Sequence, residues 1–153
     1  MKNFEMKFLV ENGILNLTSH NLEAAHAYKV VQFKNRMRNA VEALGKTQQG
    51  LVGEAGITEP EAFDARREEL AKKEKRTKSE EAELKDMNDK LNRLNELTNA
   101  LMMADAEIEP KTMPYEQFKA LQDENKDIKA QGIEILTLAE SQLEGILWKA
   151  PEE

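Results

Sequence analysis

The sequence predicts a mainly α-helical protein, a long-helix bundle or coiled-coil-like hairpin with a short N-terminal β-hairpin. Charged residues make up 33% of the 153 residues and aromatic residues only 5%, a balance typical of long helices. Apolar residues also recur at spacings of three and four along three separate stretches, as on one face of a helix. The most regular of these, called here the leucine stripe, is interrupted only by a threonine and comprises Leu84, Met87, Leu91, Leu94 and Leu101.

Residues 1–17 are predicted to form the β-hairpin. Residues 4–8 alternate apolar and charged side chains, the period of a half-buried strand. Asn12 and Gly13 then supply two residues that tolerate positive φ, as a tight hairpin turn requires. Because two strands alone are marginally stable, residues 106–111 are a candidate third strand.

Residues 20–50 are predicted to form one long helix, about 40 Å in length. Its apolar face has heptad spacing and includes Val30, Phe33, Met37, Ala40 and Leu44. Glycine weakens a helix interior, so the helix is expected to stop within a glycine-rich stretch. That stretch contains Gly45, Gly50, Gly53 and Gly56.

Residues 58–103 are predicted to form either a charged helical hairpin or one long helix. Thr58 can cap its start, and Pro60 fits the first turn. Residues 66–83 are nearly all charged, which is consistent with an exposed helix or with a helix–helix corner near Thr77–Ser79. The leucine stripe follows.

Residues 112–149 are predicted to form the C-terminal helices, which complete a single helical domain over residues 1–153. Two apolar stripes lie in this region, and Gly132 is expected to mark the joint between them. Pro151 is expected to end the ordered structure.

Two motifs suggest chemistry, and neither meets the requirements of its site. Ala40 and Gly45-Lys46-Thr47 match a loose phosphate-binding loop, but helical rather than strand periodicity precedes them. Glu23 and His26 have the spacing of a di-iron ligand pair, but such a site needs a second copy and two further glutamates. The chain also lacks cysteine, so thiolate sites are excluded. We therefore predict no catalytic, cofactor-binding or metal residue, no cofactor and no enzymatic activity, and keep a metal or nucleotide enzyme as a minor hypothesis.

Basic residues do not form a single predicted nucleic-acid surface. On a helix, Lys29 and Arg36 fall on one flank of the apolar stripe, and Lys34 and Arg38 fall on the other. We expect their stems to cover apolar surface and their charges to meet acidic neighbours. The basic run at 72–78 is diluted by glutamates and is interpreted as a solvated helix end. Nucleic acid is therefore not an expected partner.

The net charge of −7 is concentrated in the last third of the chain, which carries −7, against +2 for residues 1–55 and −2 for residues 56–104. This distribution disfavours binding to phosphate backbones and favours solubility or a basic protein partner. The sequence has no apolar run of membrane-spanning length, and its charged start does not resemble a secretion signal. A soluble, intracellular protein without a membrane partner is expected.

The order of elements resembles that of small helical bacteriophage- or prophage-encoded proteins of unknown function. The resemblance covers most of the chain and is carried by the Met-Lys start, the segments 27–31 and 34–35, a charged middle, residues 107–109 and the segment 114–118. The charged middle is longer here than in that family. The family carries no established activity, so the resemblance transfers no functional residue. It implies a viral context, in the bacterial host cytoplasm or in the virion.

The function expected from these observations is protein–protein association, by a virion or assembly component or by an accessory protein. The expected interaction residues are those of the leucine stripe and Trp148, and a homo-oligomer is expected because long helices leave such a stripe exposed. The alternative is a small acidic inhibitor that binds a basic site of a host protein, such as a nucleic-acid-processing or defence enzyme. That alternative depends on acidic residues such as Asp123, Glu124 and Asp127.

Overall fold

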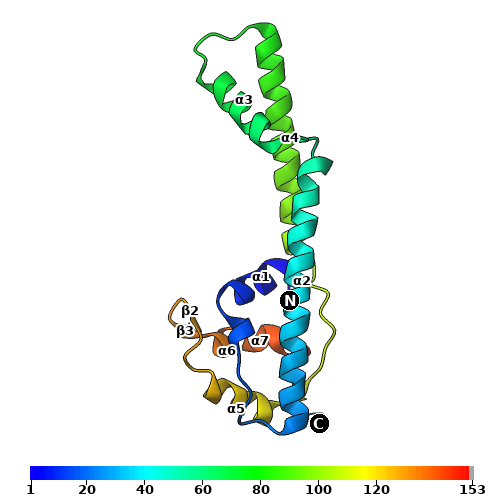
Figure 1. Cartoon of the computed structure of the whole chain (residues 1–153), viewed down its shortest axis with the longest axis vertical. Helices are drawn as coiled ribbons and strands as arrows, with labels where there is room; N and C mark the ends of the chain where they lie inside the picture. The colour runs from blue at the N-terminus through cyan, green and yellow to red at the C-terminus, as the bar shows by residue number, and fades with distance from the viewer. Residues whose placement is uncertain (152–153) are drawn as a thin grey trace. The chain divides into compact units, whose positions relative to one another are not determined.

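The computed structural model describes residues 1–151, which form a mainly helical fold with four short strands (Figure 1). The helices are α1 (Asn3–Glu11), the 3-10 turn η1 (Ile14–Asn16), α2 (Ala24–Glu54), α3 (Pro60–Lys72), α4 (Lys78–Met103), α5 (Tyr115–Glu124), α6 (Ile135–Leu138) and α7 (Glu140–Leu143). The strands are β1 (Met113–Pro114), β2 (Lys129–Ala130), β3 (Ile133–Glu134) and β4 (Trp148–Lys149). The predicted long helices are confirmed. None of the helices in residues 1–151 is both long enough and apolar enough to cross a membrane.

The chain divides into two compact units. The core unit consists of Met1–Leu44 and the described residues from Ala104 onward, and the hairpin unit consists of Gly45–Met103. Helix α2 contributes residues to both. Of the 24 buried apolar side chains in residues 1–151, only five belong to the hairpin unit: Leu51, Ala55, Ile57, Leu70 and Met87. Burial of apolar surface, the main source of folding stability, is therefore concentrated in the core unit.

The core unit surrounds its buried residues with α1, the first part of α2, α5 and the short elements near the C-terminus. Strand β1 pairs in parallel with β4, so that Met113 lies opposite Trp148. Strands β2 and β3 form a two-residue antiparallel hairpin. The largest of the fully buried side chains here are Met6, Ile14, Leu17, Met37, Met113, Phe118, Leu121, Ile135, Leu136, Leu143 and Leu147.

The predicted N-terminal β-hairpin is wrong, because this segment forms helix α1 and η1. The buried residues of α1 are Met6 and Leu9, which are three apart, whereas Phe4 remains 46% exposed. Asn12 forms the C-terminal cap of α1, and Gly13, with a φ of 95°, turns the chain into η1. The Asn-Gly pair thus ends a helix rather than turning a β-hairpin. The prediction failed because the short apolar alternation also fits a helical period.

The candidate third strand at residues 106–111 is also wrong. Hydrogen bonds at its ends fix this segment: the Ala106 N–H donates to the Met1 carbonyl and the Lys111 N–H to the Ile146 carbonyl, each at 2.9 Å. The C-terminal region contains short strands as well as helices. Gly132, with a φ of 78°, lies in the turn between β2 and β3 rather than at a joint between helices.

The hairpin unit contains the end of α2, followed by α3 and α4. Helix α2 ends at Glu54, four residues beyond its predicted end but within the glycine-rich stretch, and Gly56 follows with a φ of 90°. The Gly56 N–H donates to the Gly53 carbonyl and the Ile57 N–H to the Val52 carbonyl, the bond pattern of a glycine-terminated helix. Pro60 occupies the start of α3 as predicted, although Glu59 rather than Thr58 stands at the cap position. The charged stretch contains the predicted corner, since α3 ends at Lys72 and α4 begins at Lys78.

Candidate functional site

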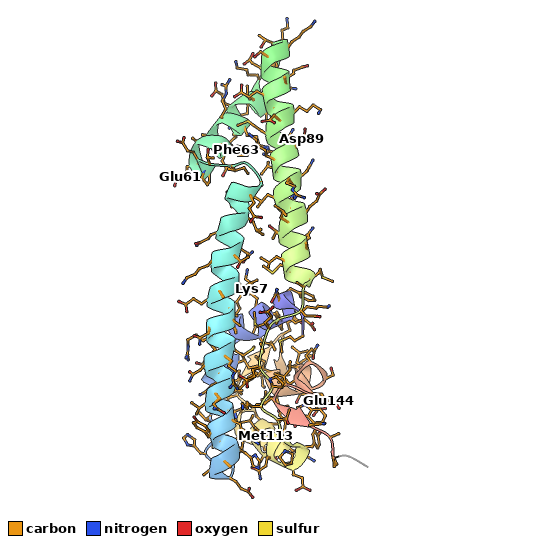
Figure 2. All side chains as sticks on the ribbon, turned by 90° about the vertical axis from the view of Figure 1, so that its right-hand side faces the viewer. Lys7, Glu61, Phe63, Asp89, Met113 and Glu144 are labelled. Atoms are coloured by element: carbon orange, nitrogen blue, oxygen red, sulfur yellow. The ribbon has the colours of Figure 1, made fainter. Side chains whose placement is uncertain are left out.

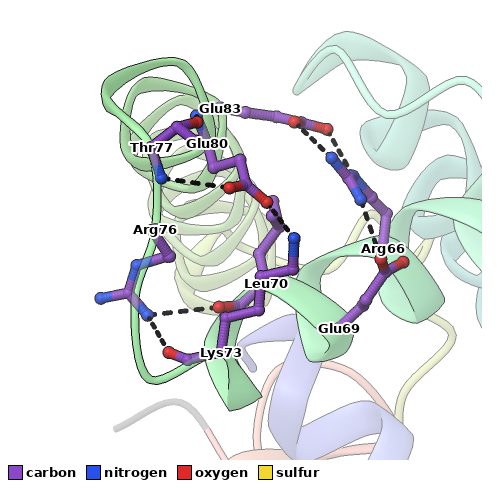
Figure 3. Close-up of polar contacts among 8 residues, drawn as sticks. All are labelled: Arg66, Glu69, Leu70, Lys73, Arg76, Thr77, Glu80 and Glu83. Atoms are coloured by element: carbon purple, nitrogen blue, oxygen red, sulfur yellow. Dashed lines mark hydrogen bonds and ion pairs between the residues drawn. The ribbon is translucent and has the colours of Figure 1, made fainter.

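Charged side chains fix α3 against the first turns of α4 (Figure 3). The Arg66 guanidinium donates two hydrogen bonds to the Glu83 carboxylate, at 2.8 and 3.0 Å, and one to Glu69 at 3.1 Å. The hydrogen bond from Arg66 holds the pKa of Glu83 below its usual value. This two-point contact sets the register of the two helices, although such exposed pairs contribute little stability.

The turn between α3 and α4 is held by the Thr77-x-x-Glu80 sequence, a capping box that our sequence analysis missed. The Glu80 N–H donates to the Thr77 hydroxyl and the Thr77 N–H donates to the Glu80 carboxylate, both at 3.1 Å. Glu80 also pairs with Lys73, and Arg76 donates to the Leu70 carbonyl at 3.2 Å (Figure 3). The turn is therefore well defined, and α4 starts at a fixed residue.

The leucine stripe lies along α4, and the hairpin unit covers it only in part. Met87 is its one buried member, with 8% exposure. The other four are half-buried: Leu84, Leu91, Leu94 and Leu101. Asp89, which projects from α4 on the side away from α3, belongs to the charged face (Figure 2). Since one side chain of the stripe is buried and four are half-covered, apolar surface remains for a further contact.

A row of asparagines borders the leucine stripe, and our sequence analysis missed it. Asn88, Asn92, Asn95 and Asn99 follow one another at intervals of four, three and four, which places them on one face of α4. Asn88 is half-buried and accepts a hydrogen bond from Arg67 at 3.0 Å, and the other three are exposed. Asparagine inside a helix costs about 0.5 kcal/mol relative to alanine, so four of them weaken α4 by about 2 kcal/mol. The repeat spacing in the sequence was the signal that could have revealed this row.

The core unit buries Trp148, the sixth predicted interaction residue. Its ring stacks on Phe118 with centroids 5.7 Å apart and lies 4.9 Å from the ring of Tyr115. Its indole N–H donates to the Glu140 carbonyl at 2.8 Å, so its polar atom is satisfied. The hydrogen bond from Tyr115 to the Glu140 carboxylate raises the pKa of that phenol. Trp148 stabilises this aromatic cluster, and we leave it out of the association surface.

The two chemical motifs have no geometry that fits their chemistry. Gly45-Lys46-Thr47 lies within helix α2, where backbone N–H groups form the helix ladder rather than a phosphate cradle. His26 Nε2 lies 3.7 Å from a Glu23 carboxylate oxygen. Within residues 1–151, no cluster of three or more His, Asp or Glu side chains could hold a metal ion.

Three basic residues of α2 help to hold the core unit together, although only one of them meets an acidic neighbour as expected. Lys29 Nζ donates to the Thr112 carbonyl at 2.8 Å, and Lys34 Nζ donates to the Leu17 carbonyl at 2.7 Å. Arg36 pairs with Glu109 at 3.3 Å. Their charges thus fix connecting segments of this unit.

An acidic residue of the alternative hypothesis also has an internal role. Glu124 accepts hydrogen bonds from the His20 and Asn21 N–H groups, each at 2.8 Å. Burial alone would raise the pKa of Glu124, but these N–H groups outweigh burial and lower that pKa. Asp123 and Asp127 are exposed, so binding to a basic host protein stays a prediction that depends on them.

The core unit also has a small apolar groove of about 290 Å³ beside α1. Phe4, Phe8 and Leu138 line it together with polar residues such as Glu5. Glu5 accepts a hydrogen bond from the Lys2 N–H at 2.9 Å, so its carboxylate is already engaged in capping α1. The groove offers apolar contact, without a converging set of reactive groups.

Comparison of the chain with protein-family models, curated proteins and solved structures gave no match. Within the described residues, α4 carries an apolar stripe that is incompletely covered.

Proposed function

We propose that this protein acts without catalysis, by protein–protein association through helix α4 of the hairpin unit. The observation that carries the proposal is the partial covering of the leucine stripe, of which only Met87 is buried. Covering the rest of a half-buried leucine contributes about 0.5–1 kcal/mol, and several such residues lie in one line. The charged flanks of α4 set the orientation of the partner.

The resemblance to phage-encoded helical proteins supports a viral setting for this association. In that setting the protein is a component of the virion or of its assembly, or an accessory protein that acts on the host. Both roles need a surface that binds protein, and α4 offers one of repeated apolar character.

The proposal is tested by replacing Leu84 and Leu91 with glutamine in one double variant of the full chain. Glutamine is a good helix former, so the change removes apolar contact and leaves the helix favoured. The matched control is Ala82→Gln/Ala100→Gln, because both alanines are exposed and lie on the opposite face of α4. Sedimentation across a concentration series measures self-association, and capture on the immobilised chain measures binding to other proteins.

We expect the leucine variant to lose at least tenfold in binding, with the alanine variant unchanged. Circular dichroism verifies that both variants keep their helices. A chain that is strictly monomeric and captures no protein contradicts the proposal, as does binding that the two double variants weaken equally.

A further inference from the structure

We infer that the asparagine row is the contact face for a second copy of this chain, in an antiparallel pairing of α4 with α4. The row consists of Asn88, Asn92, Asn95 and Asn99 and lies within the hairpin unit. This inference rests on the proposed association function and names its partner and its register.

The row is unusual because it is uncharged. One third of this chain is charged, and the other faces of α4 carry residues such as Asp86, Asp89, Lys90 and Arg93. A face that only meets water gains nothing from asparagine, which is a poorer helix former than glutamate or lysine. A face that becomes covered gains stability from asparagine, because moving a neutral amide out of water costs less free energy than moving a charged group.

The partner is a second copy because the amides are self-complementary. Each carboxamide has two N–H donors and one acceptor oxygen, so two identical rows can bind each other. The Asn88 oxygen already accepts a hydrogen bond from Arg67, so Asn88 pairs through its N–H donors. The spacing of four, three and four also reads the same in both directions. A twofold axis between residues 93 and 94 therefore places Asn88 opposite Asn99 of the second copy, and Asn92 opposite its Asn95.

The same axis brings the adjoining edges of the leucine stripe together. On the helix, Leu84, Leu91, Thr98 and Met102 fall on one side of the asparagine row, and all four are half-buried. The pairing sets Leu84 within one residue of the level of Met102 of the second copy, and Leu91 within two residues of the level of its Thr98. Apolar contact along this edge then supplies affinity, and the amide pairs fix the register.

The size of the contact predicts a weak dimer. With this axis, residues 84–103 of the two α4 helices overlap over about 30 Å, so a contact about 10 Å wide covers about 300 Å² per copy. That is less than half of a standard interface, and dissociation at about 10 µM or above is expected. Dimerisation should therefore depend on concentration.

The test uses cysteine cross-linking, because the natural chain has no cysteine. Full-length Asn88→Cys and Asn99→Cys variants are mixed in a glutathione redox buffer. The protein concentration is kept above the dissociation constant of the dimer. The antiparallel pairing predicts the mixed 88–99 disulfide, whereas a parallel pairing predicts disulfides between identical positions. The matched control mixes Asp89→Cys with Ala100→Cys. These two exposed positions are also 11 residues apart, and each lies about 100° around the helix from the corresponding asparagine.

We expect the 88–99 disulfide to form at least tenfold faster than the 89–100 disulfide and faster than either homodimer. Equal rates for the two pairs, or dominance of the 88–88 disulfide, would overturn the inference. Sedimentation of the unmodified chain separates this result from the proposed function. If the chain self-associates without the 88–99 preference, the asparagine pairing fails and association through α4 stands. If the chain stays monomeric yet captures another protein through the leucine stripe, the second-copy inference alone fails.

A charge-swap experiment provides a second readout that does not require cysteine. Asn92→Lys/Asn95→Lys and Asn92→Asp/Asn95→Asp variants place like charges opposite each other, and each should weaken self-association at least tenfold. Mixing the two variants should restore dimerisation, because opposite charges then meet across the axis. Absence of both loss and rescue would contradict the pairing.

Discussion

The two units of this protein differ in what holds them together. The core unit contains 19 of the 24 buried apolar side chains described, and a buried Asn125 whose amide donates to the Thr18 and Leu121 carbonyls at 2.8 Å. The hairpin unit has five buried apolar residues, of which only Leu70 is completely inaccessible, and the ion pairs that link α3 and its following turn to α4, Arg66–Glu83 and Lys73–Glu80, are partly exposed. Because exposed ion pairs contribute little, the second unit is the one with stability to gain from a partner.

The largest predicted effect tests the core unit. Phe118→Ala removes a ring that is 0% exposed and stacks on Trp148, and should lower the free energy of unfolding by about 4 kcal/mol. Denaturant titration followed by tryptophan fluorescence measures this, since Trp148 is the only tryptophan of the chain and reports on the core unit. Tyr28→Ala, at a position 63% exposed in the same unit, is the control and should change stability by less than about 0.5 kcal/mol. Equal losses in the two variants would show that burial does not dominate this unit.

A smaller effect of opposite sign is expected in the hairpin unit. Gly50→Ala and Gly53→Ala should each stabilise α2 by about 1 kcal/mol, because both glycines are helical and an added Cβ meets nothing within 4 Å. Thermal melting followed by helical circular dichroism measures the gain. Gly56→Ala is the matched contrast and should destabilise, since its φ of 90° strains an L-residue and its Cβ would approach Lys90 at 3.2 Å. Stabilisation by all three substitutions would contradict the assigned end of α2.

The smallest effect is a pH dependence of the α3–α4 turn. The hydrogen bond from Lys73, followed by that from the Thr77 N–H, lowers the pKa of Glu80 from 4.5 to about 2. Because the folded-state pKa is the lower one, the contribution of Glu80 is fully present above pH 4.5 and is lost as the pH falls towards 2. Helical melting of the natural chain and of Glu80→Gln should therefore differ at pH 7 and converge near pH 2. Glu81→Gln, an exposed neighbour on the same helix, is the control, and an equal difference for both variants would exclude a special role for Glu80.

The comparison also explains which features could be predicted from the sequence. The long helices were predictable because their apolar spacing persists over many turns, as in the leucine stripe of α4. The N-terminal segment was not, because strand and helix periods both fit so short an apolar run. Met6 and Leu9 are buried in the core unit when this segment is helical. The local sequence pattern does not reveal that packing.

The position of the leucine stripe on a helix was predictable, and its partial covering was not. The spacing of Leu84 and Leu91 located the stripe, but its partial covering depends on where α3 and the end of α2 pack. Trp148 shows the opposite case, since its burial depends on Phe118 and Tyr115, some 30 positions earlier in the chain. The asparagine row was readable from spacing alone, although a search for charged or apolar patterns passes over neutral amides.

The discontinuous core unit has a consequence for synthesis on the ribosome. Its first segment ends at Leu44 and its second begins at Ala104, so the intervening 59 residues emerge before the core can be completed. At 5–20 residues per second, that delay is about 3–12 s, during which Met6, Leu9 and Ile14 lack the side chains that later cover them. The nascent chain therefore passes through an interval in which its apolar N-terminal segment is open to chaperones and to misassembly with other nascent chains.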